Sequence, residues 1–373
     1  MNEDKATRYH RLKRQASLAS LAWGGVLLGG LLWTGMSVTL RAFAEFLTAR
    51  IGAPDGPAVT VLFYTLILCA ISETGNLPIA FYDGFVVERR FGLSNERFAA
   101  WVLDEAKAFA IRLALAAGGT SVVYLTIRIW PQWWWLAAGT AFALIIVGLA
   151  NLAPVLLLPL FYRVKPLDRE SLRARLLALA DRAGARVLGA YEWGLGDKTR
   201  KANAALAGLG ATRRILVSDT MLADYSDEEI EVVMAHEIAH HVHGDIWKGI
   251  IFDSALILAG CYLASRLLSA LARHVGLRGA SDVAGLPLLL LAAGAVSLVM
   301  VPVAHAMSRA VERNADRFAL DLTRNPVAFI SAMRRLGAQN LAEERPSKVV
   351  QWLFYSHPPV RERIAAAQAF PER

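Results

Sequence analysis

Long apolar runs constrain this chain more than any other feature of its sequence. About six of them have the roughly 20 apolar residues that a helix needs to cross the hydrocarbon core of a bilayer. They cover residues 17–40, 58–80, 108–130, 133–161, 249–272 and 284–307. Only 19% of the residues are charged, against about 25% in an ordinary soluble domain. We therefore predict a mainly α-helical, polytopic membrane bundle with about six transmembrane helices, rather than a disordered or wholly soluble chain.

The basic residues predict how this bundle is oriented. Residues 1–17 contain Lys5, Arg8, Arg11, Lys13 and Arg14. A basic segment before the first span stays in the cytosol, and the following run is too long for a cleaved signal peptide. With about six crossings, both termini and the segments 81–107, 162–248 and 308–373 then face the cytosol. Since the composition is rich in Ala, Arg and Leu and poor in Lys, we expect a multi-pass protein of a bacterial inner membrane.

Cysteine content and charge exclude other classes of protein. The two cysteines, Cys69 and Cys261, lie inside apolar runs, so neither a disulfide scaffold nor a cysteine-based zinc site is expected. The net charge of +8 would suit nucleic acid, but no aromatic-basic recognition motif accompanies it. The expected partners are the lipid bilayer and a peptide or protein, with no nucleic acid. The oligomeric state stays open.

The segments between the runs predict a small soluble domain. Residues 168–184 have the pattern of an amphipathic helix, and residues 187–193 and 214–218 have that of short strands. A helix capped by Asp227 then runs through His240. The chain thus divides into four parts: a four-helix membrane region at 1–161 with the loop 81–107, a catalytic segment at 162–248, two further spans at 249–307, and a C-terminal catalytic segment at 308–373.

The most informative short motif is H-E-x-x-H at residues 236–240. Residues i and i+4 lie on one face of a helix, so His236 and His240 can bind one metal ion. Glu237 can then take a proton from a water molecule on that metal. The alternative is a polar helix face that happens to carry histidines, and His241 and His243 nearby favour it slightly.

A third ligand is needed, because catalytic zinc usually has three protein ligands and one open position. The downstream candidate is Glu312, in the segment S-R-A-V-E-R-N-A-D at 308–316. Asp316, one helical turn later, can accept a hydrogen bond from a ligand histidine. The alternative is an exposed helix with charges at i and i+4. We predict one Zn2+ per chain, bound by His236, His240 and Glu312.

Together these motifs resemble peptidase family M48, and within it the Ste24-type CAAX prenyl proteases. Further matching segments occur in the same order along the chain: N-L-P at 76–78, F-V-V-E-R-R-F-G at 85–92, N-A at 203–204, R-I at 214–215, D-T at 219–220, and H-P-P with a following Arg at 357–363. The resemblance implies a gluzincin-like α+β catalytic domain and membrane helices that enclose a water-filled chamber.

The resemblance also implies catalytic roles near the C-terminus. His357 would stabilise the oxyanion, with Arg363 orienting or assisting it. His-Pro-Pro is also a common way to begin a helix, so a turn residue is the alternative for His357.

The predicted substrate-binding residues are Asn203, Ala204 and Arg309, and the resemblance implies this role for Asn203. Asn203 would contact the substrate backbone beside an edge strand, although Asn is equally common in turns. Arg309 would reach a substrate carboxylate, pair with Asp316, or serve as a solvated anchor. The chain has Ala205 where the family has an aromatic residue and R-N at 313–314 where it has Tyr-Gln, which leaves substrate preference open.

The leading hypothesis is an integral-membrane zinc metalloendopeptidase that cleaves prenylated or membrane-associated peptides. One alternative is a quality-control protease for membrane proteins with no prenyl requirement, which a bacterial origin favours. A third reading is a transporter or channel, but a transporter has no need of a base beside two metal ligands.

Overall fold

The computed structural model describes residues 4–53, 55–208 and 212–371 of the chain. Its helices are α1 (Lys5–Trp33), α2 (Met36–Arg50), α3 (Gly56–Phe81), η1 (Tyr82–Val87), α4 (Glu88–Arg90), α5 (Phe98–Ile129), α6 (Trp134–Leu156), α7 (Leu158–Phe161), α8 (Glu170–Arg182), α9 (Asp219–Asp224), α10 (Asp227–Val242), α11 (Asp245–Leu271), η3 (Val283–Gly285), α12 (Leu286–Thr323), α13 (Pro326–Gln339), α14 (Lys348–Phe354) and α15 (Val360–Gln368). Its strands are β1 (Val164–Pro166), β2 (Ala190–Trp193), β3 (Ala204–Ala207) and β4 (Arg214–Ser218). The predicted class, a membrane helix bundle with a small α+β domain, is confirmed.

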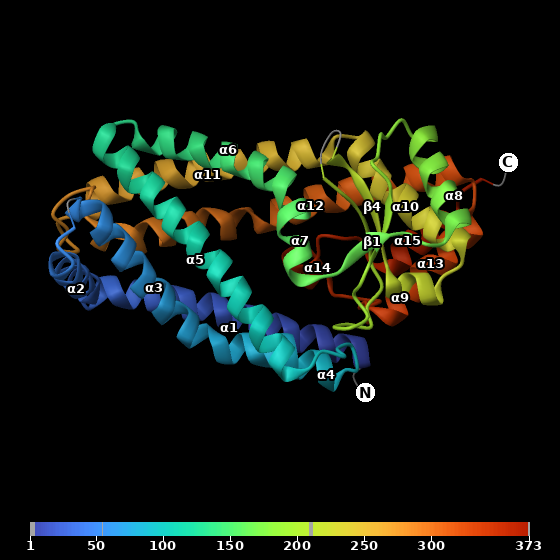
Figure 1. The fold of residues 1–373 in the computed structure, drawn as a ribbon, viewed down its shortest axis with the longest axis horizontal. Coiled ribbons are helices and arrows are strands. Elements are labelled where there is room, and N and C mark those ends of the chain that lie inside the picture. The colour runs from blue at the N-terminus through green and yellow to red at the C-terminus, as the bar shows by residue number, and fades with distance from the viewer. Residues whose placement is uncertain (1–3, 54, 209–211, 372–373) are drawn as a thin grey trace.

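Long helices form one end of the molecule and the sheet forms the other (Figure 1). Among the described residues, five helices are long and apolar enough to cross a membrane: those at Lys5–Trp33, Gly56–Arg90, Phe98–Ile129, Asp245–Leu271 and Val283–Thr323. The fourth predicted run forms α6, which extends over Trp134–Leu156 and contains a shorter apolar segment at Trp134–Ala150.

The first apolar run is not one helix. α1 ends at Trp33, and Gly35 adopts a left-handed backbone with φ of 74°, which costs glycine little. α2 follows, and it lies at the end of the bundle far from the sheet (Figure 1). There the buried guanidinium of Arg41 pairs with the carboxylate of Asp282, in the loop before α12. The predicted span 17–40 therefore ends near Trp33.

One continuous helix joins the membrane end to the catalytic end. α12 extends well beyond the predicted span 284–307, and it carries Glu312 and Asp316 as well. Since a helix rises about 1.5 Å per residue, the part from 308 to 323 projects roughly 24 Å beyond that span. The third predicted ligand is thus attached rigidly to a membrane helix.

The sheet and its helices form the second compact region. Its strand order is β1-β2-β4-β3, with β2 and β4 parallel and both outer pairs antiparallel. The predicted amphipathic helix is α8, and its leucines pack into the same core as β4, α10 and α13. β3 lies at the edge of the sheet, within a small-residue stretch that we did not predict as a strand.

Polar contacts join the two regions. Leu93 and Asn95, in the predicted loop 81–107, form backbone hydrogen bonds with Arg200 and Lys198 just before β3. On α1, the Tyr9 hydroxyl donates to Glu88 over 2.6 Å, and Lys201 lies 2.9 Å from the same carboxylate. The soluble region is thereby fixed to the first membrane helix.

Candidate metal centre

The helix that carries the H-E-x-x-H motif has strong local determinants. Ser226 is its N-cap, and a capping box with Glu229 satisfies the free N–H groups of the first turn. The expected cap, Asp227, is instead the first helical residue. Ile230 and Met234 are fully buried in the core, which fixes the helix rotation and leaves the two motif histidines on another face.

The structure brings the three predicted ligands together. Nε2 of His236 lies 3.2 Å from Oε2 of Glu312, and Nε2 of His240 lies 3.5 Å from Oε1 of the same carboxylate. One ligand atom from each of the three residues falls within 4.8 Å of the others. Two of these side chains come from α10 and the third from α12, so the centre depends on how these two helices pack.

The donor set fits a zinc ion. Two imidazole nitrogens and one carboxylate oxygen form a common ligand set of catalytic zinc. Oε2 of Glu312 is buried and accepts no hydrogen bond of good geometry, although nitrogens of His236 and His357 lie 3.2 and 2.8 Å from it. A buried carboxylate oxygen without such a bond needs a cation or a donor, and a bound zinc would satisfy it.

Each motif histidine has a carboxylate on its other ring nitrogen. Nδ1 of His236 lies 2.9 Å from Oδ1 of Asp316, and Nδ1 of His240 lies 3.2 Å from Oδ2 of Asp245. These contacts place the proton on Nδ1 and leave Nε2 to face the centre, which is the tautomer that a metal ligand requires.

Asp245 was not among the predicted site residues. It is the first residue of α11, and Gly244 before it has φ of 67°. This left-handed turn brings the chain back toward the histidine five residues earlier. An acidic residue directly after a glycine that ends the zinc helix would have been the signal in the sequence.

Buried charge shapes the protonation of the centre. Burial raises the pKa of the Glu237 carboxyl above its ordinary value, against the lowering effect of the adjacent histidines. Burial also opposes the charge of His236, but its contacts with Asp316 and Glu312 outweigh this and raise its pKa to about 9. In the metal-free protein His236 therefore carries a second proton, on Nε2, and a bound cation has to displace it.

Arg363 has a different partner from the predicted one. Its guanidinium forms a bidentate pair with Asp316, with Nε 2.8 Å from Oδ2 and Nη2 2.5 Å from Oδ1. The expectation that it orients His357 is therefore corrected: Arg363 holds the carboxylate that contacts His236. His357 itself lies beside Glu312, and its side chain is 61% exposed.

Arg309 also has partners other than the predicted ones. It is buried, and Nη1 donates to the carbonyl oxygens of Gln351 and Tyr355 over 3.1 and 2.7 Å. The pairing with Asp316 and the solvated anchor are both wrong, because Arg363 occupies Asp316 and the C-terminal segment covers Arg309. These bonds hold α14 and Tyr355, which lies two residues before His357.

The two other predicted substrate-binding residues lie at the edge of the sheet. Asn203 directly precedes β3, and its side chain is exposed. Ala204 is the first residue of β3, which pairs with β4 on one side only.

Comparison with known proteins agrees with this geometry. Residues 166–370 match the model of peptidase family M48, and residues 2–163 match the model described as CAAX prenyl protease N-terminal, five membrane helices. The chain is 30% identical over 309 residues to an uncharacterized metalloprotease of Bacillus subtilis, YhfN, a match that covers 82% of this chain and 72% of that protein.

Two yeast proteins are also similar. CAAX prenyl protease 1 of Saccharomyces cerevisiae is 30% identical over 194 residues, which cover 50% of this chain and 42% of the yeast protein. The crystal structure of Ste24p of S. mikatae has a TM-score of 0.87 at 21% identity, and the match covers 97% of this chain and 88% of that one. This similarity shows a shared fold.

Proposed function

Because this chain belongs to peptidase family M48 and is an integral-membrane metalloprotease, we propose that His236, His240 and Glu312 hold its catalytic zinc. The observation that carries the proposal is the convergence of these three ligand atoms within 4.8 Å, at the junction of α10 and a membrane helix. The carboxylate partners of both histidines support it, since ligand histidines generally have them.

When bound, zinc would acidify a water molecule and polarise the scissile carbonyl. Glu237 would accept a proton from the attacking water and deliver it to the leaving amine, and the raised pKa of its carboxyl suits both transfers. His357, exposed beside Glu312, donates a hydrogen bond to the developing oxyanion. Asp316, held by Arg363, keeps the ring of His236 in its ligand orientation.

We further propose that substrates are peptides joined to the membrane by a hydrocarbon group, and that both termini and the centre face the cytosol of a bacterial cell. Relatives named CAAX prenyl protease support the substrate class. An apolar cavity of about 510 Å3 among the membrane helices also supports it, since it has room for a hydrocarbon chain. Its walls include Leu27, Leu68, Phe142, Leu256 and Leu289.

A matched pair of reporter peptides tests this proposal. We expect the zinc-loaded protein in detergent to cleave a farnesylated peptide with a kcat/KM at least tenfold above that of its unprenylated twin, because the apolar group adds binding energy. Equal rates would instead support quality-control proteolysis without a prenyl requirement. If neither peptide nor an unfolded membrane protein were cleaved, the proposed protease function at this centre would be wrong.

A further inference from the structure

Backbone groups along β3 alternate between the sheet and its open side. The N–H of Ser218 in β4 donates to the carbonyl of Asn203 over 2.9 Å, so the polar groups of Asn203 face β4. In an antiparallel pair, the N–H and C=O of every second residue point the same way. Those of Ala202, Ala204 and Leu206 therefore point away from β4, toward the side on which another strand could add.

A side chain already occupies one end of this open edge. Nε2 of His241 lies 2.7 Å from the carbonyl oxygen of Leu206. A carbonyl only accepts, so the imidazole donates. His241 directly follows the ligand His240 on α10, and its hydrogen bond therefore ties the edge strand to the metal helix.

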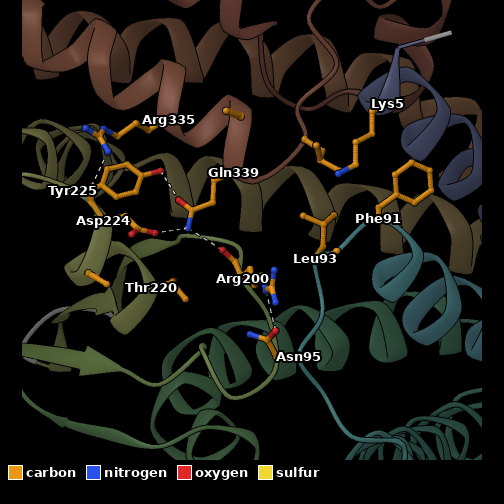
Figure 2. Close-up of a pocket in the computed structure, with 14 residues that line it drawn as sticks. Lys5, Phe91, Leu93, Asn95, Arg200, Thr220, Asp224, Tyr225, Arg335 and Gln339 are labelled. Carbon is orange, nitrogen blue, oxygen red and sulfur yellow. Dashed lines mark hydrogen bonds between the residues drawn. The ribbon is translucent and has the colours of Figure 1, made fainter. Parts of the chain in front are cut away.

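Another side chain occupies the opposite end. The N–H of Ala202 donates to Oδ1 of Asn340 over 3.1 Å, and Nδ2 of Asn340 donates to the Ala202 carbonyl over 3.1 Å. Both outward groups of Ala202 are thus paired with one amide side chain. The preceding residue on α13, Gln339, donates to the carbonyl of Arg200 in the same way, over 2.8 Å (Figure 2).

Three outward backbone groups remain between these two side chains. They are the N–H and C=O of Ala204 and the N–H of Leu206, and in the described part of the chain none of them has a hydrogen-bond partner. The Ala204 carbonyl is the one acceptor left among Ala202, Ala204 and Leu206. A peptide that adds to this edge, parallel or antiparallel to β3, can therefore donate only one backbone N–H, to the Ala204 carbonyl.

We propose that His241 and Asn340 are specificity-determining residues that limit strand addition to this three-group window. The proposal rests on the proposed function and takes the substrate to lie along β3, as the contact of Asn203 with a substrate backbone, implied by the resemblance, would require. It predicts that β3 forms backbone hydrogen bonds with only a short extended segment of the substrate. The substrate backbone on either side of this segment forms none with β3. Substrates with a proline or other irregular backbone outside the window would be accepted.

Scanning one substrate peptide with single N-methyl groups tests the window. Each N-methyl group removes one backbone donor, and the scissile amide is left unmodified. For the wild-type protein we expect one position at which N-methylation lowers kcat/KM by about tenfold, and little effect elsewhere. Two or more sensitive positions in the wild type would overturn the proposal.

Variants at the two ends should change this pattern in a defined way. His241→Ala removes the ring that covers the Leu206 carbonyl, so a second sensitive position should appear two residues from the first. Asn340→Ala removes the side chain that pairs with Ala202, so a new sensitive position should appear at the Ala202 end of the window. His241→Gln, which ends in an N–H at a similar reach, should keep the wild-type pattern.

A structural role alone would give a different result. If His241→Ala lowered kcat/KM for all peptides equally and added no sensitive position, His241 would only stabilise β3 and the proposal would be wrong. Failure of the proposed function is separate, because it would appear as no cleavage of any peptide by the wild-type protein.

Discussion

Replacing Glu237 with glutamine is expected to lower kcat by about 10²- to 10⁴-fold while the chain keeps its zinc. Glutamine has nearly the same shape as glutamate but cannot take a proton from water. The ligand atoms of His236, His240 and Glu312 are untouched by the change, so metal binding should persist. Hydrolysis of the reporter peptide and zinc content, measured on the same preparation, check the two expectations.

The zinc measurement is the control for this experiment. If activity and zinc were lost together, Glu237 would act in metal binding and its assignment as general base would fail. Retention of more than about a tenth of wild-type kcat with full zinc would contradict the assignment directly.

Replacing Asp316 with alanine should have the largest effect on stability. The substitution leaves the guanidinium of Arg363 in a nearly closed site without its bidentate partner, and breaking a buried ion pair this way costs about 3–5 kcal/mol. It also removes the carboxylate on Nδ1 of His236, so zinc affinity should fall by about 10- to 100-fold. Denaturation midpoints and competitive zinc titration measure the two effects.

Asp321 offers a matched control on the same helix. It carries the same side chain, is 53% exposed, and lies 3.9 Å from the exposed guanidinium of Arg324. Its replacement by alanine should change stability by no more than about 0.5 kcal/mol and leave zinc affinity unchanged. If Asp316→Ala behaved like Asp321→Ala, the proposed role of Asp316 in holding the centre would be wrong.

The metal motif was predictable because its parts are local. His236 and His240 lie one turn apart on a helix whose apolar pattern is clear, and helical spacing alone puts them on one face. Glu312 and Asp316 are likewise one turn apart on α12. Helical spacing alone does not show that α10 packs against α12 and brings the two pairs together. The resemblance to peptidase family M48 implies that they meet.

The contacts that sequence reasoning missed or misassigned join distant parts of the chain. Arg363 lies 47 residues from Asp316, and Arg309 lies 46 residues from the Tyr355 carbonyl that it binds. No local pattern tells which buried acceptor an arginine will reach. The side chain of Asn340 bonds to Ala202 across 138 residues, for the same reason.

Hydropathy predicted the membrane helices better than their ends. Apolar composition continues smoothly from α1 into α2, so only the backbone of Gly35 marks the break. At the other end, α12 continues past the apolar run that ends at residue 307, because tertiary packing, rather than lipid, covers Glu312 and Asp316 there. Apolar composition indicates whether a helix is surrounded by lipid, but it does not indicate the residue at which the helix ends.

The location of the metal is the most direct test of the whole account. Crystals of the zinc-loaded protein, measured on both sides of the zinc absorption edge, should give one anomalous peak per chain. We predict this peak within about 2.0–2.2 Å of Nε2 of His236, Nε2 of His240 and a carboxylate oxygen of Glu312. A zinc peak bound by other residues, or none at these three side chains in protein that cleaves peptides, would contradict it.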